Sequence, residues 1–463
     1  MTAIAKEPRE TAMDKHPKGL YVLFATEMWE RFSFYSMLAM FTLYLRDTTG
    51  QGFGWTSDRA TTLYANYLMF VYLSPLVGGW LADRKLGYRK AVMIGGVFFM
   101  AGHLLLSIRS IPFVYVALTC LVIGNGFFKP NVSTLVGNLY PEGSHLKDRA
   151  YNIFYMGINV GAFSAPVVAE FVQRKFGFHP AFAVAAGGMA ISVFILWKWK
   201  RYIEGAERSA LADAEQAAEA TALATDAPPA SVNSQDEANT GRRLTMEAVP
   251  EWKRIGALIV IYVIVIVFWM VFHQNGSTLT YWANENTDWK VSGIISNAIN
   301  PGWVILLTFP LVAFWKWLDG KGLEPSTPTK MAFGMMLTGL AFLILCIGAK
   351  IGEASVTGAN PYAFKVSPLW LLGAYGVLTA GELMLSPMGL SLVSKVAPVR
   401  VRGLMMGGWF LATAIGNKLT QIGALWDDWL HSSFWLLLSG AAFLMSIVLL
   451  VLLRPLKKAM PGV

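Results

Sequence analysis

The chain has 463 residues, of which 55% are hydrophobic and only 14% are charged, and its mean hydropathy is +0.46. Soluble domains usually contain about 25% charged residues, so a soluble protein of this length would lack the polar surface that it needs. The composition therefore indicates an integral membrane protein. The net charge of +9 does not indicate a nucleic-acid partner, because the Lys and Arg residues fall between apolar segments and no basic-aromatic recognition module is present.

The N-terminal stretch predicts a first membrane span and no cleaved leader. Residues 1–18 are polar, and the apolar stretch that begins at Gly19 is too long for a signal peptide and contains three charges. Cys120 and Cys346 lie in separate apolar segments. We therefore expect packing roles for both cysteines, with neither a disulfide framework nor a metal centre.

Twelve segments have the length and apolar character of membrane-spanning helices, which need about 20 mostly apolar residues. These segments are residues 19–46, 60–82, 91–109, 112–137, 151–173, 180–200, 254–283, 291–315, 331–350, 367–394, 403–426 and 433–453. The predicted fold is an all-α integral membrane protein with two six-helix bundles, residues 1–201 and 252–463. Residues 202–251 form the only long polar segment and are expected to link the bundles in the cytoplasm.

The distribution of positive charges predicts the orientation in the membrane. With the N-terminus inside, 27 of the 38 Lys and Arg residues fall on the cytoplasmic side, 8 fall on the opposite side and 3 lie within predicted helices. Short loops rich in Lys and Arg stay in the cytoplasm. We therefore expect a multi-pass protein of a bacterial-type inner membrane with both termini in the cytoplasm.

A glycine-rich and basic loop, GGWLADRKLGYRK, runs from Gly78 to Lys90 after the second predicted helix. It resembles the loop signature of the major facilitator superfamily, whose two halves bind substrate between them near the midplane of the membrane. The glycines permit close helix approach, and Asp83 is expected to face a helix of the other half and contribute to gating. The alternative interpretation is a loop that only fixes the orientation.

Glu27, Glu30 and Arg31 lie within the first predicted span. Ionisable groups inside a membrane are costly and are usually functional. Their spacing places them on one helix face, with Glu27 in the favourable order for an ion pair with Arg31 and Glu30 as a second acid for the same base. Such a cluster can hold or release a proton as its surroundings change. The alternative is a permanent ion pair that ties helices together.

Other polar residues lie within later spans. Lys129 is on the fourth and Glu382 on the tenth, so a cation and an anion come from opposite halves. This pair suits a zwitterion whose charges are far apart; the alternative is that each pairs only with a neighbouring helix. Tyr155 and Asn159 recur at helical spacing on the fifth span, and Asn300 precedes a proline on the eighth.

Together these motifs resemble the proton-coupled oligopeptide transporter (POT) family over nearly all of the chain outside the linker. The resemblance rests on the ExxER segment within Glu27–Tyr35, the loop Gly78–Lys90, and the segments Phe128–Val132 and Asn152–Ala162. It implies import of di- and tripeptides, driven by the proton gradient, with alternating access between the two halves. It implies no metal and no cofactor other than the coupling proton, and we expect a monomer in the lipid bilayer.

The resemblance also implies roles for individual residues. Lys129 is expected to contact the carboxyl end of the peptide, and Glu382 with Asn300 the amino end. Lys129 and Glu382 are further expected to bridge and close the cytoplasmic gate. The predicted proton-coupling residues are Glu27, Glu30, Arg31, Lys129 and His273, and the predicted substrate-binding residues are Tyr35, Tyr72, Lys129, Tyr155, Asn159, Asn300, Glu382 and Trp409.

Two positions depart from the family pattern. Many members have a basic residue seven places after the ExxER arginine, where this chain has Leu38, and an acid on the seventh helix, where it has His273. Because those two family residues are expected to pair as an extracellular gate, the sequence predicts an unusual outer gate. His273 titrates near physiological pH and is a candidate for gating or coupling; the alternative is a neutral histidine with a hydrogen bond across helices.

Three other functions fit the sequence less well than peptide symport. A transporter of the same fold for a small anion or a modified amino acid is disfavoured by the retention of Lys129, Asn159, Asn300 and Glu382. A nutrient sensor that binds without transport would not need an intact proton site. The sequence contains no nucleophile–base pair, metal motif or nucleotide loop that would indicate an enzyme.

Overall fold

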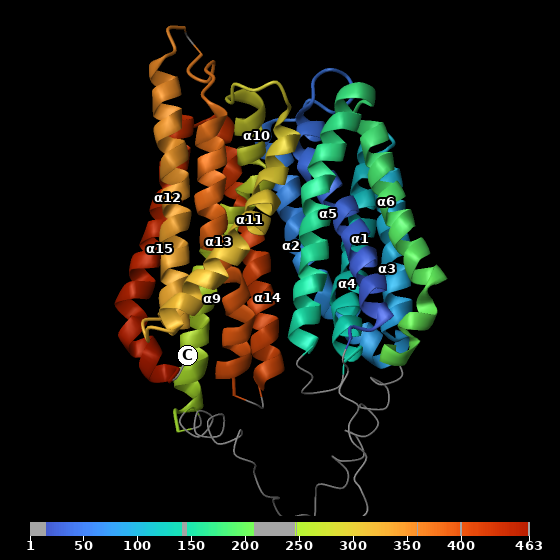
Figure 1. Ribbon diagram of the computed structural model, residues 1–463. Helices are drawn as coiled ribbons and strands as arrows, with labels where there is room; N and C mark the ends of the chain where they lie inside the picture. Colours follow the sequence, from blue (N-terminus) through green and yellow to red (C-terminus); the bar gives the residue numbers. More distant parts are fainter. Residues whose placement is uncertain are drawn as a thin grey trace, which may run out of the picture.

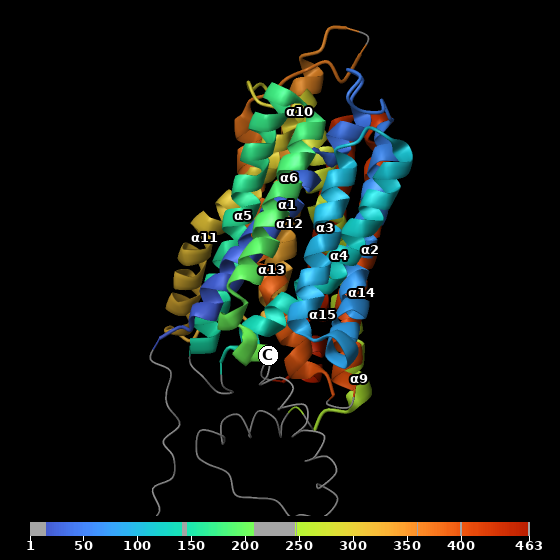
Figure 2. The same ribbon diagram turned by 90° about the vertical axis from the view of Figure 1, so that its right-hand side faces the viewer.

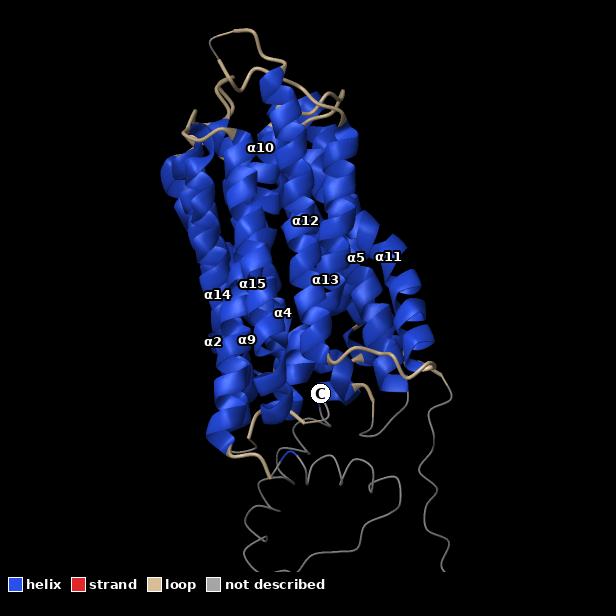
Figure 3. Ribbon diagram, turned by 90° about the vertical axis from the view of Figure 1, so that its left-hand side faces the viewer, coloured by secondary structure: helices blue, strands red, loops and turns tan. Residues whose placement is uncertain are grey.

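The structure is a computed structural model that describes residues 15–140, 146–207, 246, 248–358, 360–398 and 401–461. The described chain consists of helices and loops (Figure 3), and its β pairing is limited to an isolated bridge between Thr287 and Val366. The helices form two bundles that stand side by side (Figure 1), so the predicted all-α membrane fold is confirmed.

The N-terminal bundle contains the first six long helices. They are α1 (Lys18–Arg46), α2 (Ser57–Leu81), α3 (Tyr88–Leu106), α4 (Ile111–Asn138), α5 (Leu146–Phe176) and α6 (Phe178–Lys198), with the short elements η1 (Ala82–Leu86) and η2 (Lys200–Tyr202). All six coincide with predicted spans, and their ends differ from the predicted ends by only a few residues.

The C-terminal bundle begins after the predicted linker. Its elements are α9 (Glu251–Phe272), η3 (His273–Gly276), α10 (Thr278–Glu285), η4 (Gly293–Ile295), α11 (Ser296–Asp319), α12 (Thr327–Ala354), α13 (Pro368–Val396), α14 (Arg402–Leu419), η6 (Thr420–Asp427) and α15 (His431–Ala459). Residues 208–245 and 247 of the linker lie outside the described residues, so the boundary between the two bundles stays a prediction.

Among the described residues, ten helical segments are long and apolar enough to cross a membrane. The two predicted spans that are not among them are α1 and α14, and both contain ionisable residues. Glu27, Glu30 and Arg31 lie in α1, and Lys418 lies in α14. The same charges that lower the hydropathy of these two helices also draw attention to them as functional elements.

The seventh predicted span is not one continuous helix, as the sequence suggested, but breaks at η3 between α9 and α10. Within the break, Nε2 of Gln274 donates to the carbonyl oxygen of Thr420 at 3.2 Å. Oγ1 of Thr42 donates to the carbonyl oxygen of Gly276 at 2.8 Å, and a Cβ atom at Gly276 would lie 2.0 Å from the Tyr64 hydroxyl oxygen. The break is therefore where the C-terminal bundle meets α1 and α2, and the Thr42 hydrogen bond satisfies the backbone carbonyl of Gly276 within it.

Glycines bring helices of the N-terminal bundle into backbone contact. A Cβ atom at Gly78 of α2 would lie 2.0 Å from the carbonyl oxygen of Gly126 in α4, and one at Gly95 of α3 would lie 2.7 Å from that of Gly124. Small residues at such crossings let membrane helices pack closely. The first glycine of the loop signature thus has a packing role.

The two bundles meet along two seams. Figure 2 shows α5 and α11 on one side of the molecule and α2 and α14 on the other, and these are the helix pairs in closest contact across the interface. The short helix α10 of the C-terminal bundle lies at the end of the molecule away from the C-terminus (Figure 1). Several hydrogen bonds and ion pairs between described residues of the two bundles involve α10 or elements that contact the same region. They join Thr42 to Gly276, Arg46 to Glu285, Ser57 to Asp427, Asn66 to Lys418, Thr61 to Tyr281, Glu170 to Ser292 and Arg174 to Lys290. In the predicted orientation this is the outer end, which is therefore closed.

We predict that Gly78→Ala lowers the free energy of unfolding by about 1–3 kcal/mol, because the added methyl group has to push α2 away from the α4 backbone. The thermal unfolding midpoint of the purified protein in detergent measures this change. Gly187→Ala in α6 is the matched control, because a Cβ atom there meets nothing within 4 Å. Equal midpoints for the two variants would contradict the close α2–α4 contact.

Candidate functional site

The charged cluster of α1 is fully buried, with exposed fractions of 1% for Glu27, 0% for Glu30 and 2% for Arg31. Nη2 of Arg31 donates to Oε1 of Glu30 at 2.6 Å, and its Nε donates to the other oxygen of the same carboxylate. Oε1 of Glu27 lies 3.3 Å from Nε of Arg31. The sequence favoured Glu27 as the partner of Arg31, but the adjacent residue Glu30 makes the two-pronged contact, because the planar guanidinium matches both oxygens of one carboxylate.

Glu27 is held less firmly than Glu30. Its Oε2 is buried and has no hydrogen-bond partner among the described residues. A buried oxygen without a partner is expensive when it carries charge. Lys129 lies within electrostatic range of both acids. The geometry therefore makes Glu27 the acid that can gain or lose a proton with the least disturbance to the Arg31–Glu30 pair.

Lys129 is half-buried on α4 and lies over an aromatic ring. Its Nζ is 5.3 Å from the ring centre of Tyr72 on α2, and the Tyr72 ring meets the ring of His273 edge-on at 5.9 Å. In the described part of the chain Lys129 makes no ion pair with Glu382. The predicted cytoplasmic gate bridge is thus not formed in this conformation, and its gating role stays a prediction.

His273 caps the C-terminal end of α9 and stacks on Trp269 with 5.1 Å between ring centres. Its Nε2 is buried without a hydrogen-bond partner among the described residues. The predicted alternative of a hydrogen bond across helices therefore does not apply to this nitrogen. Leu38 is also buried, so neither position carries the family's outer ion pair.

Glu382 and Asn300 come together from neighbouring helices of the C-terminal bundle. Nδ2 of Asn300 on α11 donates to Oε2 of Glu382 on α13 at 2.8 Å. The same nitrogen donates to Oγ1 of Thr379 at 2.9 Å, which satisfies both of its hydrogens. Asn300 thus fixes the position of the Glu382 carboxylate.

Tyrosines connect the charged cluster of α1 with Glu382. Tyr35 hydrogen-bonds to Arg31 through its side chain and lies within electrostatic range of Glu382. Tyr155 on α5, 43% exposed, also lies within range of Glu382, and its carbonyl oxygen accepts a hydrogen bond from Nδ2 of Asn159 at 2.9 Å. Four predicted substrate-binding residues from both bundles therefore surround one region.

Two predicted residues lie elsewhere. Trp409 is buried inside the C-terminal bundle, where its ring covers Gly389 and meets the ring of Tyr262 edge-on at 6.4 Å. Asp83 is exposed on η1 and hydrogen-bonds to Tyr88 of its own bundle. Among the described residues, the hydrogen bond of Asp83 is thus within its own half, and its gating role stays a prediction.

Two residues of the site were not singled out from the sequence. Thr379 lies three residues before Glu382, and this helical spacing is the signal that could have identified it. Tyr67 on α2 lies within electrostatic range of Arg31 and Glu30, and its buried hydroxyl has no hydrogen-bond partner among the described residues. An isolated tyrosine in an aromatic-rich helix gives no comparable signal.

Comparison with known proteins identifies similar chains. Residues 89–428 match the POT family. The chain is 31% identical to an uncharacterized transporter of Bacillus subtilis, over 100% of this chain and 98% of that protein. It is 30% identical to a di-/tripeptide transporter of Lactococcus lactis subsp. lactis, over 96% of this chain and 97% of that protein. A crystal structure of a peptide transporter POT in complex with sulfate superimposes with a TM-score of 0.80 at 29% identity, covering 97% of each chain.

Glu30→Gln is expected to destabilise the protein more than Glu27→Gln. The first variant removes a carboxylate that accepts two charged hydrogen bonds, each worth about 1.5–3 kcal/mol, whereas the second removes a carboxylate with one unpartnered oxygen. The thermal unfolding midpoints of the two variants in detergent give the comparison, and each differs from the natural chain by a single amide. A lower midpoint for Glu27→Gln would contradict the assignment of Glu30 as the main partner of Arg31.

Proposed function

This chain belongs to the POT family, and we propose that it is a proton-coupled symporter that imports di- and tripeptides across the cytoplasmic membrane. The observation that carries the proposal is the buried cluster of Glu27, Glu30 and Arg31 within electrostatic range of Lys129. It occurs in a chain that is similar, over 96% of its length, to a protein named as a di-/tripeptide transporter. Transport by a monomer with both termini in the cytoplasm, without an enzymatic step or a cofactor, is part of this proposal.

The proposed peptide site uses charge at both ends of the substrate. Lys129 from the N-terminal bundle attracts the peptide carboxylate, and Glu382, positioned by Asn300, attracts the peptide ammonium. Tyr155 and Asn159 supply hydrogen-bonding groups for the peptide backbone. A peptide that satisfies both charges must contact both bundles, so its binding is linked to their relative position.

The proposed coupling step depends on one unit of charge. With a proton on Glu27, the Arg31–Glu30 pair is neutral as a whole, and the Lys129 charge is available for a peptide carboxylate. When Glu27 loses its proton, its carboxylate competes for Lys129 and weakens the hold on the peptide. Proton and peptide therefore bind together and are released together.

The proposed cycle alternates between the two ends of the bundle interface. In the proposed orientation, the contacts between the bundles lie at the outer end. Lys129 and Glu382 form no ion pair with one another in the described part of the chain. In this conformation the proposed pathway is open toward the cytoplasm, so the peptide and the proton are released on that side. After release, an ion pair between Lys129 and Glu382 would close the cytoplasmic end, and Asp83 would engage the opposite bundle.

We predict that the purified protein in proteoliposomes accumulates labelled dialanine when an inward proton gradient is imposed, and only equilibrates it when the gradient is absent. The measurement is uptake with and without the gradient, with empty liposomes as the control. Absence of gradient-driven uptake by correctly folded protein would contradict proton-coupled peptide symport.

Glu27→Gln is expected to abolish accumulation against a gradient but to retain exchange of labelled for unlabelled dialanine, because the amide mimics the protonated acid and cannot release a proton. His273→Gln is the comparison variant. His273 stacks on Trp269, and its buried Nε2 has no hydrogen-bond partner among the described residues. Because no acceptor is in place for a second N–H on the ring, the pH profile of uptake should keep its shape in this variant. A shifted profile would instead assign His273 a part in coupling.

A further inference from the structure

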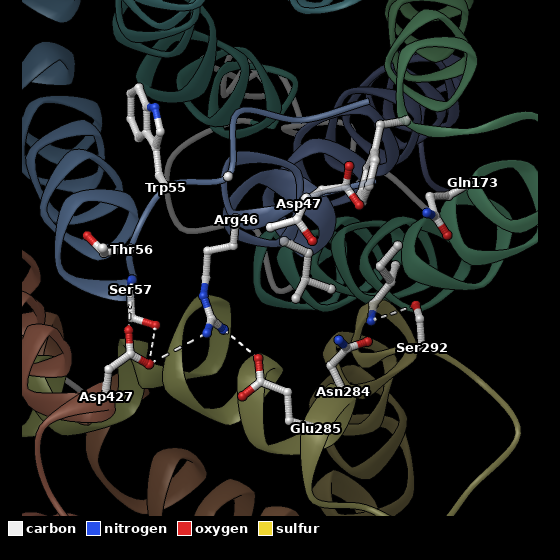
Figure 4. Close-up of a pocket in the computed structure, with 15 residues that line it drawn as sticks. Arg46, Asp47, Trp55, Thr56, Ser57, Gln173, Asn284, Glu285, Ser292 and Asp427 are labelled. Atoms are coloured by element: carbon white, nitrogen blue, oxygen red, sulfur yellow. Dashed lines mark hydrogen bonds and ion pairs between the residues drawn. The ribbon is translucent and has the colours of Figure 1, made fainter. Parts of the chain in front are cut away.

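The outer end of α1 reaches the C-terminal bundle through Arg46, the last residue of that helix. Its Nη1 donates to Oε1 of Glu285 on α10 at 2.7 Å, and its Nη2 lies 3.6 Å from Oδ1 of Asp427 on η6. The guanidinium lies over the ring of Tyr281, 4.1 Å from its centre. Figure 4 shows Arg46 between the two carboxylates, so one cation from the first bundle holds two anions of the second.

Asp427 also binds the beginning of α2. Its carboxylate accepts hydrogen bonds from the backbone nitrogen of Ser57 at 3.1 Å and from Oγ of Ser57 at 2.8 Å (Figure 4). The first backbone N–H groups of a helix have no partner within it and carry partial positive charge. Asp427 therefore neutralises two positive groups of the N-terminal bundle, the Arg46 side chain and the start of α2.

These contacts can break without leaving a buried charge. The exposed side-chain fractions are 19% for Arg46, 38% for Glu285 and 46% for Asp427. A pocket of about 530 Å³ adjoins all three residues. When the bundles separate at this end, water can solvate each charge, which is the property that distinguishes a reversible contact from the buried Arg31–Glu30 pair.

We propose that Arg46, Glu285 and Asp427 form an ionic outer gate, which closes the extracellular end of the proposed transport pathway. Leu38 and His273 cannot form an ion pair. Arg46 lies eight residues beyond Leu38 on α1, or about 12 Å farther along the helix at 1.5 Å per residue. The inference rests on the proposed alternating access, because a gate has meaning only if the outer end opens during transport.

The test uses an introduced cysteine that becomes accessible from outside the cell only when the outer end opens. Thr42 is fully buried one turn below Arg46 and contacts Gly276 of the other bundle. With Cys120 and Cys346 replaced by alanine, Thr42→Cys in intact cells reports opening through its reaction with a membrane-impermeant maleimide. Adding Arg46→Gln is expected to raise the labelling rate at least about tenfold, because opening no longer separates the charges.

Arg59→Gln is the matched control. Arg59 is an exposed arginine of the same outer face, and its guanidinium lies over Trp55 of its own bundle, 3.8 Å from the ring centre. The rate of Thr42→Cys labelling should therefore not change in this variant. An equal rise in both variants would mean that loss of any outer positive charge loosens the protein, and would overturn the gate.

A second set of variants tests whether faster labelling comes from loss of the ion pairs or from a general loss of packing. Glu285→Gln combined with Asp427→Asn should raise the labelling rate as much as Arg46→Gln, and all three changes together should have no larger effect. Additive effects, or no change in labelling, would overturn the proposal. Labelling requires no transport, so a failed gate with intact dialanine uptake is distinguishable from a failure of the proposed function. Arg46→Lys keeps the positive charge, so Thr42→Cys should be labelled slowly in this variant. If Arg46→Gln does not fold, Arg46→Lys is compared with the Glu285→Gln and Asp427→Asn double variant instead.

Discussion

The structure depends on how the buried guanidinium of Arg31 interacts with two carboxylates, those of Glu27 and Glu30. Arg31 satisfies both oxygens of Glu30 and only one oxygen of Glu27. Glu27 is buried, so its remaining negative charge needs a proton or the nearby cation of Lys129. A peptide carboxylate needs the same cation. In the proposed function, competition for Lys129 is thus the physical link between proton binding and peptide binding.

The ionic contacts of Arg31 and those of Arg46 differ in their burial and in the elements that they join. The cluster of α1 is buried and belongs to a single helix, so its members stay together whatever the bundles do. The contacts of Arg46 are partly exposed and join different bundles, so in the proposed cycle they break when the outer end opens. In that proposal, the buried cluster holds the proton and the contacts between the bundles form the gate.

Much of this arrangement follows from sequence patterns. Apolar length located the helices, and helical spacing placed the charges of α1 on one face. The choice of Glu30 over Glu27 depends on how Arg31 folds back on its neighbour, which spacing does not determine. Hydropathy could not predict the break at η3, because it depends on distant hydrogen-bond partners. Thr42, for example, donates to the carbonyl oxygen of Gly276. Helical spacing could not identify the partners of Arg46, because Glu285 lies 239 residues away in the sequence.

The central claim is that peptide binding and protonation of Glu27 are linked through Lys129. Calorimetric titration of dialanine, repeated in buffers of different ionisation enthalpy, measures the protons taken up when the peptide binds. At a pH where Glu27 is ionised, we expect uptake of about one proton by the natural protein and none by Glu27→Gln. The same proton uptake in both proteins would contradict it.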